Sequence, residues 1–316
     1  MRIIEGTTEF HISERTVVAI GKFDGVHLGH QKLLKQMCNW KKQGLTAVVF
    51  TFDKSPASVF APGTQTAELT MLSEKRVLME ELGADVLVEF PMTVQTAATP
   101  ADIFVREVLS RQLNAAVIVA GEDVSFGHKG LGNRQLLEKL AQPLGYQVEI
   151  VDKLSAAEVL PQYEKRVAVS STLVRELLET GNMEEVTALC GRPYSVWGPV
   201  IHGNHMGGPV LHMPTINVAW PVGKLTPPFG VYYSQTVLDG KRYASITNVG
   251  CKPTVTEKKN VLAETYLYGY EGDAYGEEAQ VFFYEYKRPE RKFDGLETLR
   301  EQMQRDIAQG REWWKL

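Results

Sequence analysis

The first half of the chain alternates between strand-like and helix-like segments, and this alternation limits the fold more than any other feature. Short apolar runs of strand character occupy residues 17–20, 47–52, 86–90, 116–120 and 148–151. Segments with helical spacing lie between them, at 31–43, 73–82, 101–112 and 134–142. Because helices usually connect parallel strands, we expect an α/β domain with a parallel sheet covered by helices. Ligands bind beyond the carboxyl ends of such strands, where loops 21–30, 53–56 and 121–133 are predicted to converge.

The second half has a different pattern of predicted secondary structure. Two helices are predicted at 171–180 and 183–190, and the segment Cys190–Tyr194 then breaks helix character. Short β-type runs follow at 195–201, 230–238, 243–249, 263–270 and 279–286, separated by glycine and proline. Evenly spaced short strands predict an antiparallel β-barrel, with a terminal helix over 296–307 packed on it. We therefore predict two domains, residues 1–190 and 191–316.

Composition excludes several classes of protein. The chain has 316 residues and a formal net charge of −4, so no broad basic surface for nucleic acid is expected. Its three cysteines are widely separated, which favours reduced thiols in a cytoplasmic protein. The first residues lack a signal-peptide core, and no apolar run approaches the roughly 20 residues that span a bilayer. We expect no membrane or nucleic-acid partner; a weak homo-oligomer is left open.

The segment Gly21–His30 joins the first predicted strand to the first predicted helix and reads G-K-F-D-G-V-H-L-G-H. Glycines at 21, 25 and 29 allow close backbone approach to a ligand. A helix N-terminus suits phosphate, and His27 and His30 lie beside it, where imidazoles can stabilise developing negative charge. The chain contains no ordinary P-loop sequence, so a nucleotide would be bound through this segment.

Three further motifs follow in chain order: G-E-D-V-S-F-G at 121–127, V-S-S-T-L-V-R at 169–175 and C-G-R-P-Y at 190–194. With Gly21–His30, they resemble the FAD synthetase family, the prokaryotic bifunctional riboflavin kinase/FMN adenylyltransferases. The resemblance implies a Rossmann-like nucleotidylyltransferase domain followed by a riboflavin kinase-like antiparallel barrel with a terminal helix. It implies small-molecule substrates: ATP and riboflavin, with FMN as intermediate, FAD as product and Mg²⁺ as cofactor.

For the first domain, the resemblance implies attack by the FMN phosphate on the α-phosphate of ATP, with His27, His30, Arg175 and Mg²⁺ stabilising the transition state. The implied ATP-binding residues are Gly21, Phe23, Asp24, Gly25, Gly29, Ser170, Ser171 and Thr172, and the implied flavin-binding residues are Asp53, Pro56, Asp123 and Phe126. Two alternatives stay open: the hydroxyls at 170–172 can serve only as a helix cap, and Phe126 can belong to the core. Lys54 and Ser55 depart from the family pattern, which usually has proline and histidine there.

For the second domain, the resemblance implies that Glu264 is the general base on the terminal ribityl hydroxyl of riboflavin. Thr215 and Asn217 in the P-T-I-N segment would bind Mg²⁺. The implied ATP-binding residues are Gly203, Gly207, Gly208, Pro214, Thr215 and Asn217, and the implied flavin-binding residues are Arg288 and Glu290. The loop 203–213 lacks the family's usual arginine, and its histidines, with His202, match no known zinc spacing.

The unusual loop leaves an alternative with one activity only: an FMN adenylyltransferase whose degenerate barrel only binds flavin. A flavin-sensing regulatory protein and a nucleotidylyltransferase for another phosphate acceptor are further alternatives. The intact Gly21–His30 segment and the acidic balance disfavour the regulator, and the kinase-like barrel disfavours the other acceptor. Turnover of riboflavin and of FMN by the purified protein separates these hypotheses.

Overall fold

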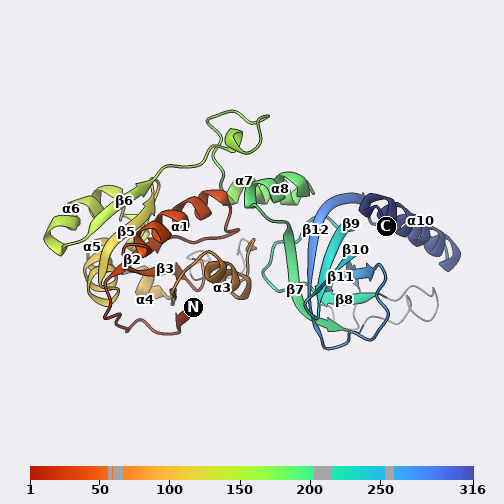
Figure 1. The fold of residues 1–316 in the computed structure, drawn as a ribbon, viewed down its shortest axis with the longest axis horizontal. Helices are drawn as coiled ribbons and strands as arrows, with labels where there is room; N and C mark the ends of the chain where they lie inside the picture. The colour runs from red at the N-terminus through yellow and green to blue at the C-terminus, as the bar shows by residue number, and fades with distance from the viewer. Residues whose placement is uncertain (56–58, 60–66, 203–214, 253–259) are drawn as a thin grey trace. The chain divides into compact units, whose positions relative to one another are not determined.

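The computed structural model describes residues 1–55, 59, 67–202, 215–252 and 260–316, and they form two compact units, Met1–Ser171 and Thr172–Leu316 (Figure 1). The predicted division at 190/191 remains a prediction for the functional domains. None of the helices in the described ranges is long and apolar enough to cross a membrane.

The first unit is built on a six-stranded sheet in the order β1-β4-β3-β2-β5-β6, in which every neighbouring pair is parallel. The strands are β1 (Arg2–Glu5), β2 (Thr16–Ile20), β3 (Thr46–Phe52), β4 (Val86–Phe90), β5 (Ala115–Gly121) and β6 (Gln147–Val151). This confirms the expected α/β fold and all five predicted strands. Strand β1 was not predicted, because its residues are mostly exposed and carry no apolar run.

Helices cover both faces of this sheet (Figure 1). They are α1 (Leu28–Lys41), α3 (Leu72–Glu81), α4 (Val94–Ala97), α5 (Ala101–Ile103), the π-helix η1 (Phe104–Gln112), the 3₁₀ turns η2 (His128–Gly130) and η3 (Ala156–Glu158), and α6 (Arg134–Leu144). Successive side chains of β2 alternate between two cores. Val17 and Ala19 pack with residues of α1 and α3, whereas Val18 and Ile20 pack with residues of η1 and α6.

The second unit begins with α7 (Ser171–Glu179), whose first residue closes the first unit, and α8 (Met183–Cys190). A closed antiparallel barrel follows in the order β10-β11-β8-β7-β12-β9. Its strands are β7 (Tyr194–Ile201), β8 (Ile216–Ala219), β9 (Gly230–Leu238), β10 (Lys241–Lys252), β11 (Asn260–Leu267) and β12 (Glu278–Pro289). The predicted barrel is confirmed; the short strand β8 contains the end of the P-T-I-N motif and is the one barrel strand that had no apolar run among those predicted.

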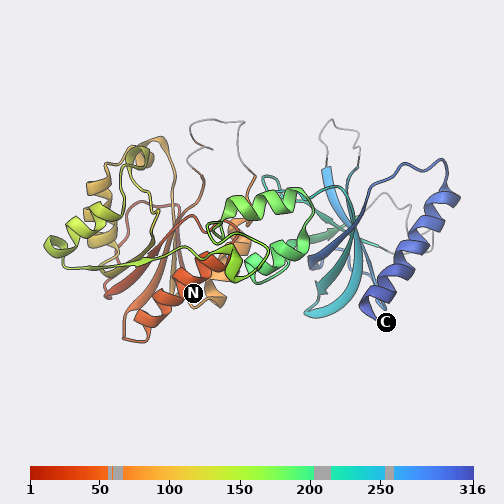
Figure 2. The ribbon, with the colours of Figure 1, turned by 90° about the horizontal axis from the view of Figure 1, so that it is seen from above.

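The interior of the barrel contains apolar and hydroxyl side chains, and the terminal helix covers one side of the barrel. Fully buried hydroxyls form a chain of hydrogen bonds through Thr236, Ser245, Ser234, Thr247 and Thr265, at 2.7–2.9 Å. Helix α10 (Leu296–Trp314) lies beside the barrel wall (Figure 2), where Ile307 packs against Val231, Tyr233 and Ile246. This helix was predicted to end near 307 and extends seven residues further.

Candidate functional site

The two predicted histidines lie at the junction of β2 and α1. His27 is the N-cap of α1, and its Nδ1 accepts a hydrogen bond from the backbone N–H of His30 at 3.4 Å. The two imidazole rings stack, with centroids 3.7 Å apart and planes 19° apart. His27 is only 5% exposed, and the ring of Phe23 contacts His30 edge-on. The sequence therefore brings two imidazoles to one helix N-terminus, where backbone N–H groups also favour an anion.

The glycine between the histidines is required by packing. A Cβ on Gly29 would lie 3.1 Å from Nδ1 of His27 and 3.3 Å from the carbonyl oxygen of Val169. Both distances are shorter than ordinary carbon contacts, so a larger residue would displace the ring or the backbone. Gly29 therefore allows the 169–171 segment to approach the histidine pair.

That segment carries the predicted hydroxyls. Ser171 Oγ donates to the carbonyl oxygen of Asp24 at 2.8 Å, which joins residues 147 positions apart. Ser170 is half-buried and Thr172 is exposed. Arg175 is a half-buried residue one helical turn after Ser171 on α7.

The flavin-side predictions fall on loops after β3 and β5, the strands that flank β2. Parallel strands end at the same sheet edge, so the described parts of the three predicted loops share it. Asp53 accepts the N–H of Met92 at 2.7 Å, and exposed Asp123 pairs with Lys153 at 3.0 Å. Phe126 lies in the core, which was the alternative interpretation: it is 4% exposed and packs on Phe104. Phe23 is buried in the core on the opposite face of the sheet. Pro56 lies outside the described residues.

A second group of predicted residues meets on the barrel. Glu264 of β11 pairs directly with Asn217 of β8, and Thr215 Oγ1 donates to Glu264 Oε1 at 3.2 Å. Asn217 is 3% exposed, and its Oδ1 is buried without a hydrogen-bond partner among the described groups. A buried carbonyl oxygen of this kind is a ready ligand for a cation or a water.

The same cross-strand row continues to β10, where Asn248 pairs with Glu264. Asn248 Nδ2 donates to Glu290 at 3.1 Å, and Gly250 makes room for that carboxylate, since a Cβ there would lie 2.0 Å from Glu290 Oε1. Arg288 forms a largely buried ion pair with Asp306 of α10. Asn248 was not predicted as a site residue, because strand register is not readable from sequence.

Several predicted ATP-binding residues fall outside the described residues, namely Gly203, Gly207, Gly208 and Pro214, and so do the loop histidines His205 and His212. No group of three or more histidine, cysteine or acidic side chains suited to a metal occurs in the part of the chain that the structure describes.

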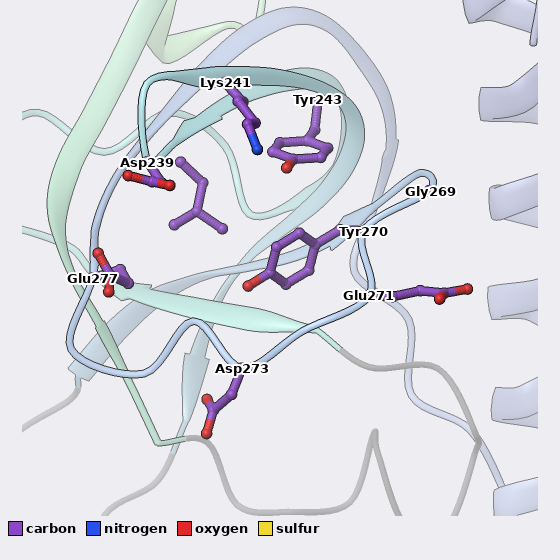
Figure 3. A pocket seen from close by; sticks show the side chains of 9 residues that line it. Asp239, Lys241, Tyr243, Gly269, Tyr270, Glu271, Asp273 and Glu277 are labelled. Atoms are coloured by element: carbon purple, nitrogen blue, oxygen red, sulfur yellow. The ribbon is translucent and has the colours of Figure 1, made fainter.

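A cavity of about 380 Å³ opens at the other end of the barrel strands (Figure 3). It is lined by residues of the β9–β10 turn, of the start of β10 and of the segment after β11, including Asp239, Lys241, Tyr243, Tyr270 and Glu277. Leu238 pairs with Lys241 at that end, whereas the Glu264 row lies where Val231 pairs with Asn248. None of the predicted site residues lines this cavity.

The comparisons with known proteins agree with the two-part organisation. A family model described as FAD synthetase matches residues 9–162, and one described as riboflavin kinase matches residues 190–314. A relative from Listeria monocytogenes, named bifunctional riboflavin kinase/FMN adenylyltransferase, is 35% identical over 302 residues, covering 95% of this chain and 93% of its own. A Bacillus subtilis relative of the same name is 32% identical over 317 residues, with coverage of 97% and 96%.

A solved structure from Streptococcus pneumoniae, titled macrolide-efflux protein, superposes over 98% of both chains with a TM-score of 0.85 and 26% identity. Its title differs from the names of the curated relatives. The likeness extends over both the parallel sheet and the barrel, because nearly the whole of each chain is covered.

Proposed function

The chain belongs to the family of bifunctional riboflavin kinase/FMN adenylyltransferases, and we propose that it makes FAD from riboflavin in two ATP-dependent steps. The observation that carries this proposal is the match of separate FAD synthetase and riboflavin kinase models to its two halves. Relatives of that name are matched over more than nine-tenths of their length. The efflux title of the structural neighbour has no counterpart in either family model.

The second step is assigned to the domain predicted over residues 1–190. A phosphate oxygen of FMN attacks the α-phosphorus of ATP, the bond between the α-phosphorus and its bridging oxygen breaks, and pyrophosphate leaves. The stacked His27 and His30 stabilise the charge that develops on the phosphates, together with the N-terminus of α1. Arg175 and the hydroxyls of Ser170, Ser171 and Thr172 are proposed to bind the triphosphate, supported by the contact of Ser171 with the loop before α1.

The roles of the loop residues divide between ligand and support. Gly21, Gly25 and Gly29 are proposed to bind ATP through backbone groups of this loop. Asp24 and Phe23 support the loop, since one carboxylate oxygen of Asp24 accepts the N–H groups of Leu69 and Thr70 and the Phe23 ring is fully buried. Asp53 and Asp123 are proposed to contact flavin from the neighbouring strand ends, together with Pro56.

The first step uses the barrel. Glu264 removes the proton from the terminal ribityl hydroxyl of riboflavin. The hydroxyl oxygen then attacks the γ-phosphorus of an ATP bound to the barrel, and ADP leaves. Mg²⁺ fits Thr215 and Asn217, because Asn217 has a buried Oδ1 and pairs across the strands with Glu264, whose carboxylate the Thr215 hydroxyl contacts. Bound there, the ion would neutralise phosphate charge. Arg288 and Glu290 are proposed to bind flavin, and the loop that contains Gly203, Gly207 and Gly208 to bind ATP.

We also propose that the enzyme is cytoplasmic, acts on small molecules alone and needs no nucleic acid or membrane, as its charge balance and scattered cysteines favour.

Incubation of the purified protein with riboflavin, ATP and Mg²⁺ tests the function: FMN should accumulate with ADP, followed by FAD with pyrophosphate. Formation of FAD from FMN without phosphorylation of riboflavin would instead support the monofunctional alternative, which the departure at 203–213 motivates. Formation of neither FMN nor FAD would contradict both the bifunctional proposal and the monofunctional alternative.

A further inference from the structure

The loop between β2 and α1 has an unusual backbone. Phe23 has φ = 52° and Val26 has φ = 41°, and Gly25 between them has φ = 81°. Bulky and β-branched residues rarely adopt positive φ, because Cβ crowds the backbone. Such conformations persist only where the surroundings hold them, and they are common at functional sites. This loop ends at His27, so whatever holds it also sets the position of that ring.

The carbonyl of Lys22, directly before the first strained residue, is held by two donors. Lys75 Nζ donates to it at 3.0 Å from helix α3, and Thr51 Oγ1 donates to it at 3.2 Å from strand β3. Both Lys75 and Thr51 are almost fully buried. Asp24, which follows Phe23, is held through its carboxylate. It accepts the backbone N–H groups of Leu69 and Thr70, which lie in the segment leading into α3. The start of α3 therefore supports the strained loop from one side.

Lysine is a costly residue for this support. Its side chain is 3% exposed, whereas lysines are almost never buried without a partner. Burial lowers the pKa of Lys75; the carboxylates of Glu68, Asp24 and Glu89 oppose that effect, and the charge of Lys22 adds to it. Methionine would fill the same space without burying a charge. The feature of lysine that methionine lacks is the N–H donor directed at the Lys22 carbonyl.

We propose that Lys75 is a positioning residue for adenylyl transfer: by holding the Lys22 carbonyl, it fixes the strained loop that carries His27. This inference rests on the proposed function of the histidine pair. Lys75 makes no contact with either imidazole that the structure records; it acts through the backbone between residues 22 and 27. Thr51 shares this role as the second donor.

The test compares Lys75→Met with Lys75→Arg, which keeps a cationic donor, and with Lys139→Met, a matched change at an exposed lysine of α6. FAD formation from FMN and phosphorylation of riboflavin are measured on the same preparations, with the unfolding temperature as a control. Displacement of a catalytic group by up to 1 Å can cost about 100-fold in rate. In Lys75→Met we expect kcat for FAD formation to fall about 10- to 100-fold, with KM nearly unchanged and kinase activity retained. Lys75→Arg should recover part of the loss. Lys139→Met should match wild type.

A second variant keeps the test decisive if Lys75→Met does not fold. Thr51→Val is nearly isosteric and removes the other donor to the same carbonyl, so it should also lower kcat for FAD formation and spare kinase activity. Full kcat in folded Lys75→Met or in Thr51→Val would overturn the inference, and so would equal losses of both activities. Wild-type protein that forms no FAD would instead refute the proposed function, so the two failures are distinguishable.

Discussion

Replacement of Gly29 by alanine tests whether the position of the His27 ring, rather than the presence of the histidines alone, supports adenylyl transfer. The added Cβ would lie 3.1 and 3.2 Å from two atoms of the His27 ring and 3.3 Å from the Val169 carbonyl oxygen. The ring cannot yield freely, since it is 5% exposed and stacked on His30 at 3.7 Å. It must therefore shift by a few tenths of an ångström or push the backbone of residue 169.

Two opposing terms decide the effect on stability. Alanine gains about 0.5–1 kcal/mol over glycine in a helix, and overpacking costs about 1–3 kcal/mol. The net change is a loss of at most about 2.5 kcal/mol, which leaves a domain of ordinary stability folded. The rate should still fall measurably: we expect FAD formation to fall about tenfold or more, because the substitution displaces a group that acts on the transition state.

The assay is the conversion of FMN and ATP to FAD, followed by chromatography, with riboflavin phosphorylation on the same protein as the internal reference. Gly198→Ala is the matched control, because its Cβ would meet only Val218, at an ordinary 3.6 Å. Gly29→Ala that folds and forms FAD at the wild-type rate would refute the reasoning.

Three further predictions concern other parts of the chain. Asn217→Leu should abolish phosphorylation of riboflavin and leave FAD formation from FMN intact, since it removes the buried amide oxygen proposed to bind Mg²⁺; Mg²⁺-dependent kinase activity equal to wild type would refute that assignment. Phe126→Ala should destabilise the first unit by about 3–5 kcal/mol in denaturant unfolding, whereas Phe126→Leu should leave KM for FMN unchanged; a large rise in KM would favour contact with flavin over a core role. Burial raises the pKa of Tyr146 to about 12, so its stabilisation is present below its unfolded value of 10.0 and is lost as pH rises toward 12. Tyr146→Phe loses the hydrogen bond to the Leu137 carbonyl, about 1 kcal/mol, and this deficit should close near pH 11; a gap that is constant from pH 8 to 11 would contradict the titration.

Sequence periodicity predicted the elements that place the first site. Apolar runs located β2, β3 and β5, and the parallel arrangement then required their following loops to share one edge. The G-K-F-D-G-V-H-L-G-H segment placed both histidines at the strand-to-helix junction, where the structure has them.

The support of that site was not predictable from the sequence. A carboxylate such as Asp24 has the same sequence signal whether it binds a ligand or accepts backbone N–H groups from Leu69 and Thr70. Likewise, Phe126 is equally consistent with stacking on a flavin and with packing on Phe104. Only tertiary contacts separate these interpretations. Lys75 gave no signal, because a helical lysine is exposed far more often than it is buried.

The barrel shows a second limit. The motif P-T-I-N and the segment around Glu264 were each identified, but strand pairing is set by non-local register. The opposition of Asn217 and Glu264, and the row that extends to Asn248, therefore came from the structure alone. The π-helix η1 was predicted as ordinary helix, because the spacing of its apolar residues suits both.

The central claim is that two separate sites on one chain perform two successive reactions. The most direct test follows riboflavin, ATP and Mg²⁺ over time in wild type, His30→Ala and Glu264→Gln, with FMN supplied in a parallel set. We predict that His30→Ala accumulates FMN and forms no FAD, whereas Glu264→Gln forms no FMN from riboflavin yet converts supplied FMN to FAD. Loss of both reactions in either folded variant would contradict the account.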